Sequence, residues 1–281
     1  MSTEIELVTC IVPTYNRPQL LARCLDSIRN QDYSNIETIV VDNGILPETR
    51  QVIQNAQNSG MLITHISHGK TIPAFNNWLA GLMAAKSEFI KIVWDDDWLE
   101  ATCVSKLVRL KQELGADAIM CGAYGHVGQK DYVWYQQEDF VSNSFMETFP
   151  MIARRLLPNS PLAILMRRND AIDAMTLLNY PQGAISDNLV VGPDLAMNFW
   201  ALAKGGKLVF IKDPLVHMYG DGTNMTQLHE KILPALYRET LRNLTKHFGY
   251  KLGLKNRLLL NSTTSSRYTP IRILGKLLHW S

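Results

Sequence analysis

Short apolar runs alternate with segments of helical periodicity through the first 94 residues, and this alternation restricts the fold more than any other feature. The apolar runs predict strands over residues 7–12, 36–41, 62–66 and 89–94. Helices are predicted between them, over residues 18–28, 47–58 and 73–85. Strands that alternate with helices pair in parallel through crossover connections. We therefore predict an α/β fold with a Rossmann-like, mainly parallel sheet flanked by helices.

The rest of the chain is less regular and predicts both kinds of element. Further helices are predicted over residues 100–113, 145–155, 168–176, 194–204 and 226–248. Further strands are predicted over residues 117–124, 131–136, 162–167, 207–211 and 215–219. Residues 180–192 contain Pro, Gly, Ser and Asn and predict a loop. No linker separates the two halves near Leu99, so we expect them to share one core.

Charge is distributed unevenly along the chain. Residues 240–281 hold eight of the 28 Lys and Arg and none of the 26 Asp and Glu. This basic end predicts an anionic surface as its partner. Within it, residues 267–280 form an amphipathic segment that Pro270 can open as a helix. Such a helix either rests on an anionic membrane or packs on the rest of the chain or on another subunit. No recognised nucleic-acid-binding motif occurs, so nucleic acid is not an expected partner.

The sequence also predicts a location. The four cysteines form no CxxC pair and lie in apolar contexts, which favours reduced core residues. The chain begins Met-Ser-Thr-Glu, unlike a secretory signal, and no run approaches the ~20 apolar residues that cross a bilayer. We expect a cytoplasmic protein, with peripheral attachment to the inner face of the cytoplasmic membrane as the alternative that the basic end favours.

Three consecutive carboxylates, Asp95, Asp96 and Asp97, follow the apolar run 89–94. Adjacent carboxylates repel each other, so a cation is expected beside them. Open α/β sheets bind ligands at the carboxyl ends of their strands, which is where this triplet would lie. In an extended chain Asp95 and Asp97 would share one side. The structural alternative is that Asp97 caps a helix opening near Trp98.

Four segments carry a resemblance to a known family: VTCIVPTYNRPQLLARCLDSI, IETIVVDNG, FIKIVWDDDWL and PDLAMNFWALAKGGKLVFIKDPLVHM. In order and spacing they resemble the landmarks of family 2 glycosyltransferases, which have the GT-A fold of the nucleotide-diphospho-sugar transferase superfamily. The resemblance covers roughly residues 5–220. It implies a nucleotide-sugar-binding half in residues 1–99 and an acceptor-binding half of the same GT-A domain in residues 100–225. Residues 226–281 would form a C-terminal helical, basic extension.

The resemblance also implies an activity. The chain would be a metal-dependent, inverting enzyme that moves a sugar from a nucleotide diphospho-sugar, with a UDP-sugar as first candidate. The acceptor would be a hydroxyl of a glycan or lipid-linked molecule in polysaccharide biosynthesis. Mn²⁺ or Mg²⁺ would be the cofactor, because such ions bridge carboxylate and phosphate oxygens. By resemblance Asp97 and Asp95 hold the metal, and Asp96 belongs to the donor site. His217 would complete the coordination or be a hydrogen-bonded structural histidine.

The turn after the first strand would line the nucleotide by the same resemblance; it comprises Pro13, Thr14, Tyr15, Asn16 and Arg17. An aromatic ring at Tyr15 suits the face of a base. Asn16 could instead cap the following helix at Pro18. Asp42, after the second strand, would accept a hydrogen bond from the base or act as a turn carboxylate. Here Ile45 and Leu46 stand where many family members have polar residues.

Two further polar residues, Lys70 and Asn77, would contact nucleotide or phosphate. A solvated surface lysine is the alternative for Lys70.

Asp194 is the predicted general base that deprotonates the acceptor hydroxyl, and Asp187 is the alternative base. The family usually has Glu-Asp here, whereas this chain has Pro193-Asp194, and an N-cap is the structural alternative for Asp194. The missing Glu keeps open a catalytically silent nucleotide-sugar- or glycan-binding protein with the same fold. A sugar nucleotidyltransferase is disfavoured, because the turn after the first strand lacks a Gly-rich phosphate loop.

Overall fold

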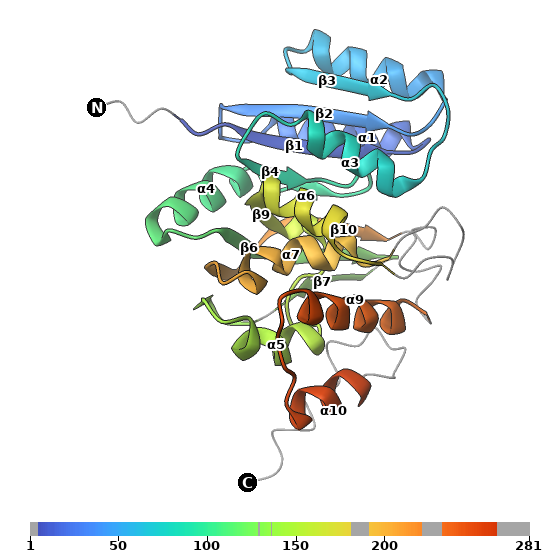
Figure 1. Ribbon diagram of the computed structural model, residues 1–281. Helices are drawn as coiled ribbons and strands as arrows, with labels where there is room; N and C mark the ends of the chain where they lie inside the picture. Colours follow the sequence, from blue (N-terminus) through green and yellow to red (C-terminus); the bar gives the residue numbers. More distant parts are fainter. Residues whose placement is uncertain (1–4, 129, 136, 181–190, 221–231, 263–281) are drawn as a thin grey trace.

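The computed structural model describes residues 5–128, 130–135, 137–180, 191–220 and 232–262 (Figure 1). Its strands are β1 (Val8–Thr14), β2 (Ile36–Asp42), β3 (Ile63–Ser67), β4 (Phe89–Ile92), β5 (Trp98–Leu99), β6 (Ala118–Val127), β7 (Lys130–Trp134), β8 (Phe140–Ser142), β9 (Ile164–Arg167) and β10 (Leu208–Gly220). Its helices are α1 (Pro18–Arg29), α2 (Pro47–Asn58), α3 (Ala74–Ala84), α4 (Cys103–Leu114), α5 (Phe145–Ala153), α6 (Arg168–Leu177), α7 (Pro193–Ala203), α9 (Leu233–His247) and α10 (Leu254–Ser262), with a short 3₁₀ turn η1 (Pro161–Ala163).

The strands of the described residues form one sheet in the order β3-β2-β1-β4-β9-β6-β10-β5, with β7 beside β6 and β8 beside β10. Strands β1 to β4 are mutually parallel, and β10 is parallel to β6. Because β9 is antiparallel to both β4 and β6, these two groups point the same way. The mainly parallel sheet predicted from the sequence is therefore confirmed. The carboxyl ends of β1, β2, β3, β6 and β10 share one edge, toward which the arrows of β1 and β2 point in Figure 1.

The core lies on both faces of this sheet, as expected for parallel strands. All seven residues of β1 are buried. Side chains alternate between faces, so Ile11 of β1 belongs to the apolar cluster that includes residues of α3, α6 and α7, whereas Cys10 and Val12 belong to the cluster that includes residues of α1, α2 and α4. Both clusters combine residues from before and after Leu99. The four cysteines are buried and unpaired, as predicted.

The C-terminal helices extend one side of this core. Helix α9 packs on α7, where the rings of Trp200 and His247 lie 5.1 Å apart, and α10 packs on α5. In Figure 1, α9 and α10 lie at the end of the molecule opposite to α2 and β3. Among the described residues, no helix is long and apolar enough to cross a membrane.

Several predicted boundaries differ from the structure. The two strands expected over residues 207–219 are one strand, β10, whose pairing with β6 shifts register around Pro214 because proline lacks an N–H donor. Strand β5 was not predicted, and α4 starts at Cys103 rather than at residue 100. Strand β8 and helix α10 were not predicted. Most of the predicted loop 180–192, the first residues of the predicted helix 226–248 and the predicted amphipathic segment 267–280 lie outside the described residues.

Candidate functional site

The acidic triplet lies in a turn at the carboxyl edge. Asp95 and Asp96 form the turn after β4, and Asp97 leads directly into β5. The expectation of an extended chain is therefore wrong. The helix-cap alternative for Asp97 is also wrong, because a strand follows it and Trp98 pairs with His217 of β10.

Asp95 is fastened to the turn that follows β1. The Thr14 hydroxyl donates to Asp95 Oδ2 at 2.8 Å, the Tyr15 N–H to the same oxygen at 3.3 Å, and Arg17 Nη1 to Oδ1 at 3.4 Å. Burial, followed by the neighbouring Asp96, raises the pKa of Asp95 to about 6, and Arg17 and the two other donors oppose this rise. Three of the predicted donor-site residues therefore meet the acidic turn itself.

Two arginines hold Asp96. Arg17 Nη1 donates to its carboxylate at 2.9 Å, and Arg23 Nη2 donates to its carbonyl oxygen at 2.6 Å. The Arg23 guanidinium also lies over the rings of Trp98 and Tyr219, at 4.0 and 4.7 Å from their centroids. The sequence does not single out Arg23, because its partners are more than 70 residues away in the chain.

Asp97 connects the turn to the end of β10. Its side chain is buried, and the Tyr219 N–H donates to its Oδ1 at 2.9 Å. Burial and the adjacent Asp96 raise the pKa of Asp97 well above the usual range, whereas the bond from Tyr219 lowers it. The ends of β1 and β10 are thus joined through the two outer carboxylates of the triplet.

The donor set of this turn fits a divalent cation. Asp95 and Asp97 are buried carboxylates next to a third, Asp96, and burial raises the pKa of both, so a cation beside them would favour their ionised forms. The described residues hold no ready group of three or more Asp, Glu, His or Cys ligands. Mg²⁺ is usually bound by one or two protein carboxylates together with substrate phosphates and water, so two carboxylates suffice.

His217 lies in a different cluster from the one predicted. Its Nε2 is 2.7 Å from Glu100 Oε1, and its Nδ1 is 2.9 Å from His126 Nε2. The ring stacks on Trp98 at 4.7 Å and on Tyr124 at 4.8 Å. Burial lowers the pKa of His217 despite the opposing effect of Glu100. Because both ring nitrogens are occupied by protein, the structural alternative describes His217 better than the metal-ligand prediction does.

Asn16 joins the turn after β1 to the turn after β2. It adopts a positive φ of 53°, and its Oδ1 accepts from the Ile45 N–H at 3.2 Å. Arg17 is the N-cap residue of α1, and its side chain makes no capping hydrogen bond. The alternative in which Asn16 caps this helix is therefore wrong. A Cβ at Gly44 would lie 2.3 Å from Asn16 Oδ1, so glycine is required for this close approach.

Asp42 has the geometry of a turn carboxylate. It is buried, and its Oδ1 accepts from the Gly44 N–H at 2.9 Å, while Oδ2 lies 3.7 Å from His65 Nε2. The neighbouring Asn43, which the sequence analysis did not single out, exchanges two hydrogen bonds with the backbone of Ile72, at 2.8 and 2.9 Å. These contacts fix the loop that leads into α3.

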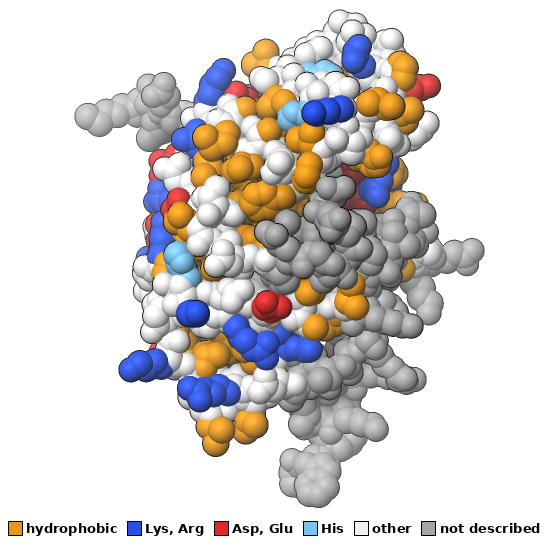
Figure 2. Space-filling view, turned by 45° about the vertical axis from the view of Figure 1, so that its right-hand side comes forward, with side chains coloured by type: hydrophobic (Ala, Val, Ile, Leu, Met, Phe, Trp, Pro, Cys, Tyr) orange, Lys and Arg blue, Asp and Glu red, His pale blue; other side chains and the backbone are white. Residues whose placement is uncertain are grey.

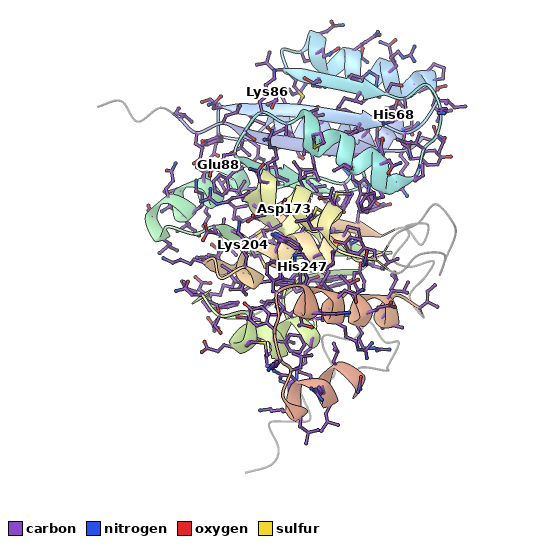
Figure 3. All side chains as sticks on the ribbon, in the orientation of Figure 1. His68, Lys86, Glu88, Asp173, Lys204 and His247 are labelled. Atoms are coloured by element: carbon purple, nitrogen blue, oxygen red, sulfur yellow. The ribbon has the colours of Figure 1, made fainter. Side chains whose placement is uncertain are left out.

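Asn77 and Lys70 occupy different environments. Asn77 is buried on α3, donates to the Val41 carbonyl at 3.1 Å and lies 3.1 Å from His68 Nε2. Asn77 thus contacts His68, which Figure 3 labels near the loop before α3, and its expected contact with nucleotide or phosphate stays a prediction. Lys70 is exposed in this loop. Tyr15 is also exposed, to 52%, which leaves its ring accessible beside the acidic turn.

Asp194 lies in the first turn of α7, where Gly192 is the N-cap, so the N-cap alternative for Asp194 is wrong. The Tyr237 hydroxyl of α9 donates to Asp194 Oδ2 at 2.5 Å. Burial raises the pKa of Asp194 to about 6, and this bond is the main effect that opposes the rise. Asp187, the alternative base, lies outside the described residues.

The orientation of α7 places Asp194 toward the carboxyl edge. Gly206, in the turn from α7 to β10, lies against Asp117 just before β6 begins, and the Lys207 N–H donates to Asp117 at 2.8 Å. The end of α7 is therefore at the amino edge of the sheet. Because α7 then returns into β10, its first turn lies at the opposite, carboxyl edge.

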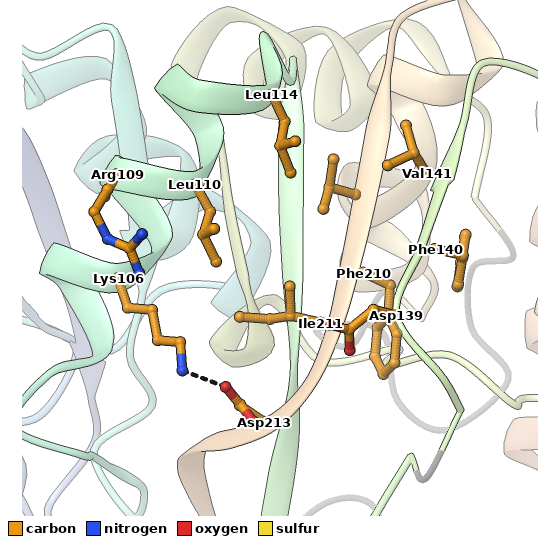
Figure 4. A pocket seen from close by; sticks show the side chains of 11 residues that line it. Lys106, Arg109, Leu110, Leu114, Asp139, Phe140, Val141, Phe210, Ile211 and Asp213 are labelled. Carbon is orange, nitrogen blue, oxygen red and sulfur yellow. Dashed lines mark hydrogen bonds and ion pairs between the residues drawn. The ribbon is translucent and has the colours of Figure 1, made fainter.

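A separate hollow of about 460 Å³ lies between α4, β8 and the first half of β10 (Figure 4). Leu110, Phe140 and Ile211 line it, and Lys106 pairs with Asp213 at its rim. It contains none of the predicted site residues, which meet β10 at its other end.

Comparisons with known proteins identify the family of this chain. The sequence model of "Glycosyl transferase family 2" matches residues 9–173. A Campylobacter jejuni protein named GalNAc(5)-diNAcBac-PP-undecaprenol beta-1,3-glucosyltransferase is 35% identical over 107 residues, which cover 38% of this chain and 35% of that protein. Glycosyltransferase GlyG of Streptococcus pneumoniae is 30% identical over 48% of this chain and 46% of its own length. The chain thus matches less than half the length of these curated relatives.

The fold is shared with a solved structure. The crystal structure of S. aureus TarS 1–349 in complex with UDP-GlcNAc superposes with a TM-score of 0.69 at 17% identity, covering 98% of this chain and 76% of that one. This likeness confirms the predicted GT-A class of α/β fold. Since the family model covers more than half of the chain, the protein belongs to glycosyl transferase family 2, and the resemblance found in the sequence is confirmed.

Proposed function

We propose that this chain is a metal-dependent, inverting glycosyltransferase that transfers a sugar from a nucleotide diphospho-sugar to a hydroxyl of a glycan or lipid-linked acceptor. The observation that carries the proposal is the buried acidic turn at the carboxyl edge, fastened by Asp95 to the end of β1 and by Asp97 to the end of β10. A UDP-sugar is the first donor to test, because the TarS complex contains UDP-GlcNAc. The Campylobacter relative is named for a lipid-linked acceptor, and this favours a role of the present chain in polysaccharide biosynthesis.

The donor half would act by positioning. Asp97 and Asp95 would hold Mn²⁺ or Mg²⁺, and a divalent ion there neutralises charge on the departing diphosphate. Arg17, which already bridges Asp95 and Asp96, would orient these carboxylates. The exposed ring of Tyr15 would lie along the nucleotide base. A mannosyltransferase from Pyrobaculum calidifontis, whose structure contains GDP-Man and Mn²⁺, has the same fold at a TM-score of 0.55 and 15% identity.

Asp194 would be the general base. Its pKa of about 6 leaves it ionised at neutral pH yet more basic than an ordinary carboxylate, which suits proton abstraction. As the acceptor oxygen attacks C1 of the donor sugar, its proton passes to Asp194, and the C1–O electron pair leaves with the nucleoside diphosphate. Tyr237 would orient the carboxylate through its hydroxyl. Pro193 replaces the usual Glu and serves as the first residue of α7.

The experiment is a thermal-shift panel of UDP-, GDP-, dTDP- and CMP-sugars with and without Mn²⁺, followed by a turnover assay on the best donor. A ligand at ~100 times its dissociation constant adds ~2.7 kcal/mol of stability, which is readily seen. Asp97→Asn should abolish the metal-dependent shift, whereas Asp26→Asn, a matched change at an exposed helix carboxylate, should not. Donor binding without turnover would favour the catalytically silent binding protein. The lack of any shift in folded protein would exclude the donor site.

A further inference from the structure

The segment from α9 to α10 carries many exposed cations and one exposed acid, Glu239 of α9. Five exposed cations lie on it: Arg242, Lys246, Lys251, Lys255 and Arg257. Between residues 240 and 262 the chain has no Asp or Glu. Figure 2 shows Lys and Arg side chains gathered over this lower part of the molecule, with hydrophobic side chains at its end.

Part of this charge surrounds one hollow. Lys246, Lys251 and Arg257 line a depression of about 390 Å³ beside the turn at Gly249, where α9 ends. Arg242 reaches across from α9 and donates to Asn261 of α10 at 2.8 Å. The cations of the two helices therefore form one surface, because residues of α9, of the turn after it and of α10 line the same hollow. The neighbouring α5 region adds one exposed acid, Glu147, and two exposed arginines, Arg154 and Arg155.

Helix α10 exposes leucines in the middle of these cations. Leu254 is 75% and Leu258 is 59% exposed, and their spacing of four residues puts them on the same helical face. On the opposite face Leu260 is buried in the core and Leu259 packs against it. The helix is thus anchored to the protein by one pair of leucines and presents the other pair outward. Lys255 and Arg257 lie on either side of the exposed pair.

We propose that this surface docks the protein on an anionic phospholipid bilayer, with Leu254 and Leu258 entering the headgroup region and the five cations contacting lipid phosphates. Basic helices with an outward apolar ridge lie in the plane of a membrane interface. Anionic lipids supply the complementary charge, whereas a nucleic acid would leave the two leucines without a partner. Docking does not require sugar transfer. It rests on the proposed function in one respect only, since a lipid-linked acceptor would be the molecule that docking brings within reach of the site.

The test is flotation of the full chain with phosphatidylcholine vesicles containing 0 or 30% phosphatidylglycerol. We expect binding to the anionic vesicles that weakens with salt. Lys251→Gln/Lys255→Gln/Arg257→Gln should lower the partition coefficient about 100-fold, because each charge near such a surface contributes about fivefold. Leu254→Ser/Leu258→Ser should lower it at least about tenfold. Neither set of changes touches a buried side chain, and thermal melts confirm folding.

Matched controls lie at the other end of the molecule. Arg50→Gln/Lys86→Gln removes exposed cations, and Leu62→Ser removes a leucine that is 81% exposed; both should bind as wild type does. The proposal is overturned if the α10 variants also bind as wild type does. It is equally overturned if only the charge variant loses binding, since that pattern describes a general polyanion surface. Donor-dependent thermal shifts, measured without vesicles, should be unchanged in all variants, so that a failure of the proposed function is seen separately.

Discussion

Asp194→Asn should make the protein inactive and more stable at neutral pH. Burial raises the pKa of Asp194 in the folded chain to about 6, about two pH units above that of an unfolded aspartate. The folded state therefore binds the proton more tightly than the unfolded state does. The contribution of this group to the free energy of unfolding is fully present below pH ~4 and is lost as the pH rises to about 6. At neutral pH the buried charge is a net cost.

The magnitude follows from the same difference. Two pH units correspond to about 3 kcal/mol of unfolding free energy. Asp194 keeps partial contact with solvent and lies at a favourable helix N-terminus, so we expect a net gain of about 1–2 kcal/mol for the asparagine variant. For a chain of this size that gain raises the Tm by roughly 2–6 °C. The asparagine side-chain oxygen can still accept a hydrogen bond from the Tyr237 hydroxyl, so the contact between α7 and α9 is preserved.

The assay is urea unfolding of wild type and variant at half-unit steps from pH 4 to pH 8. The two stabilities should coincide near pH 4, separate up to about pH 6 and stay a constant distance apart above it. Turnover of the variant should fall at least about 100-fold with unchanged donor binding. A variant that is less stable at pH 7.5, or a gap that does not change with pH, would refute the buried-carboxylate reasoning. Turnover near that of wild type would refute the assignment of the base.

Three further outcomes are expected. Thr14→Val keeps the side-chain shape but removes the donor to Asp95, so metal-dependent donor affinity should fall about tenfold in titration calorimetry, and unchanged affinity would contradict the link. Gly44→Ala should weaken donor binding because its Cβ would meet Asn16 Oδ1, and Asn16→Gly added to it should restore folding stability more than it restores affinity. Removal of divalent cations by EDTA should abolish transfer reversibly, with Mn²⁺ restoring it; full activity in EDTA would exclude the metal-dependent reaction.

The first half of the fold could be predicted within one or two residues because its signals are local. Strands β1 and β2 are continuous apolar runs, and Pro18 and Pro47 mark the first residues of α1 and α2. The errors lie where long-range pairing decides. Trp98–Leu99 is a strand only because β10 pairs with it, and three residues of β8 are ordered by the start of the same strand. Pro214 predicts a break between two strands, yet β10 continues through it with a shift of register.

The sequence predicted which residues belong to the site better than it predicted the contacts among them. The sequence pointed to Thr14, Arg17 and the acidic triplet, but it could not show that the first two bind Asp95 across some 80 residues of chain. Arg23 and Tyr237 were missed for the same reason, because their partners are set by packing between α1 and β5 and between α7 and α9. For His217 the sequence left the metal-ligand and structural alternatives open, because its place in a predicted strand says nothing of the rings of Trp98 and Tyr124 that surround it.

These contacts give the acidic turn a structural role in addition to its negative charge. The outer carboxylates hold the ends of β1 and β10, two strands that lie far apart in both sequence and sheet order. Burial and the neighbouring Asp96 raise the pKa values of both carboxyls, so an added cation would be favoured where the two strand ends meet. A cation bound there would tighten Thr14 and Tyr219 together, because each already donates to one of its ligands. Amide hydrogen exchange at the ends of β1 and β10 should therefore slow together when Mn²⁺ and the donor are added.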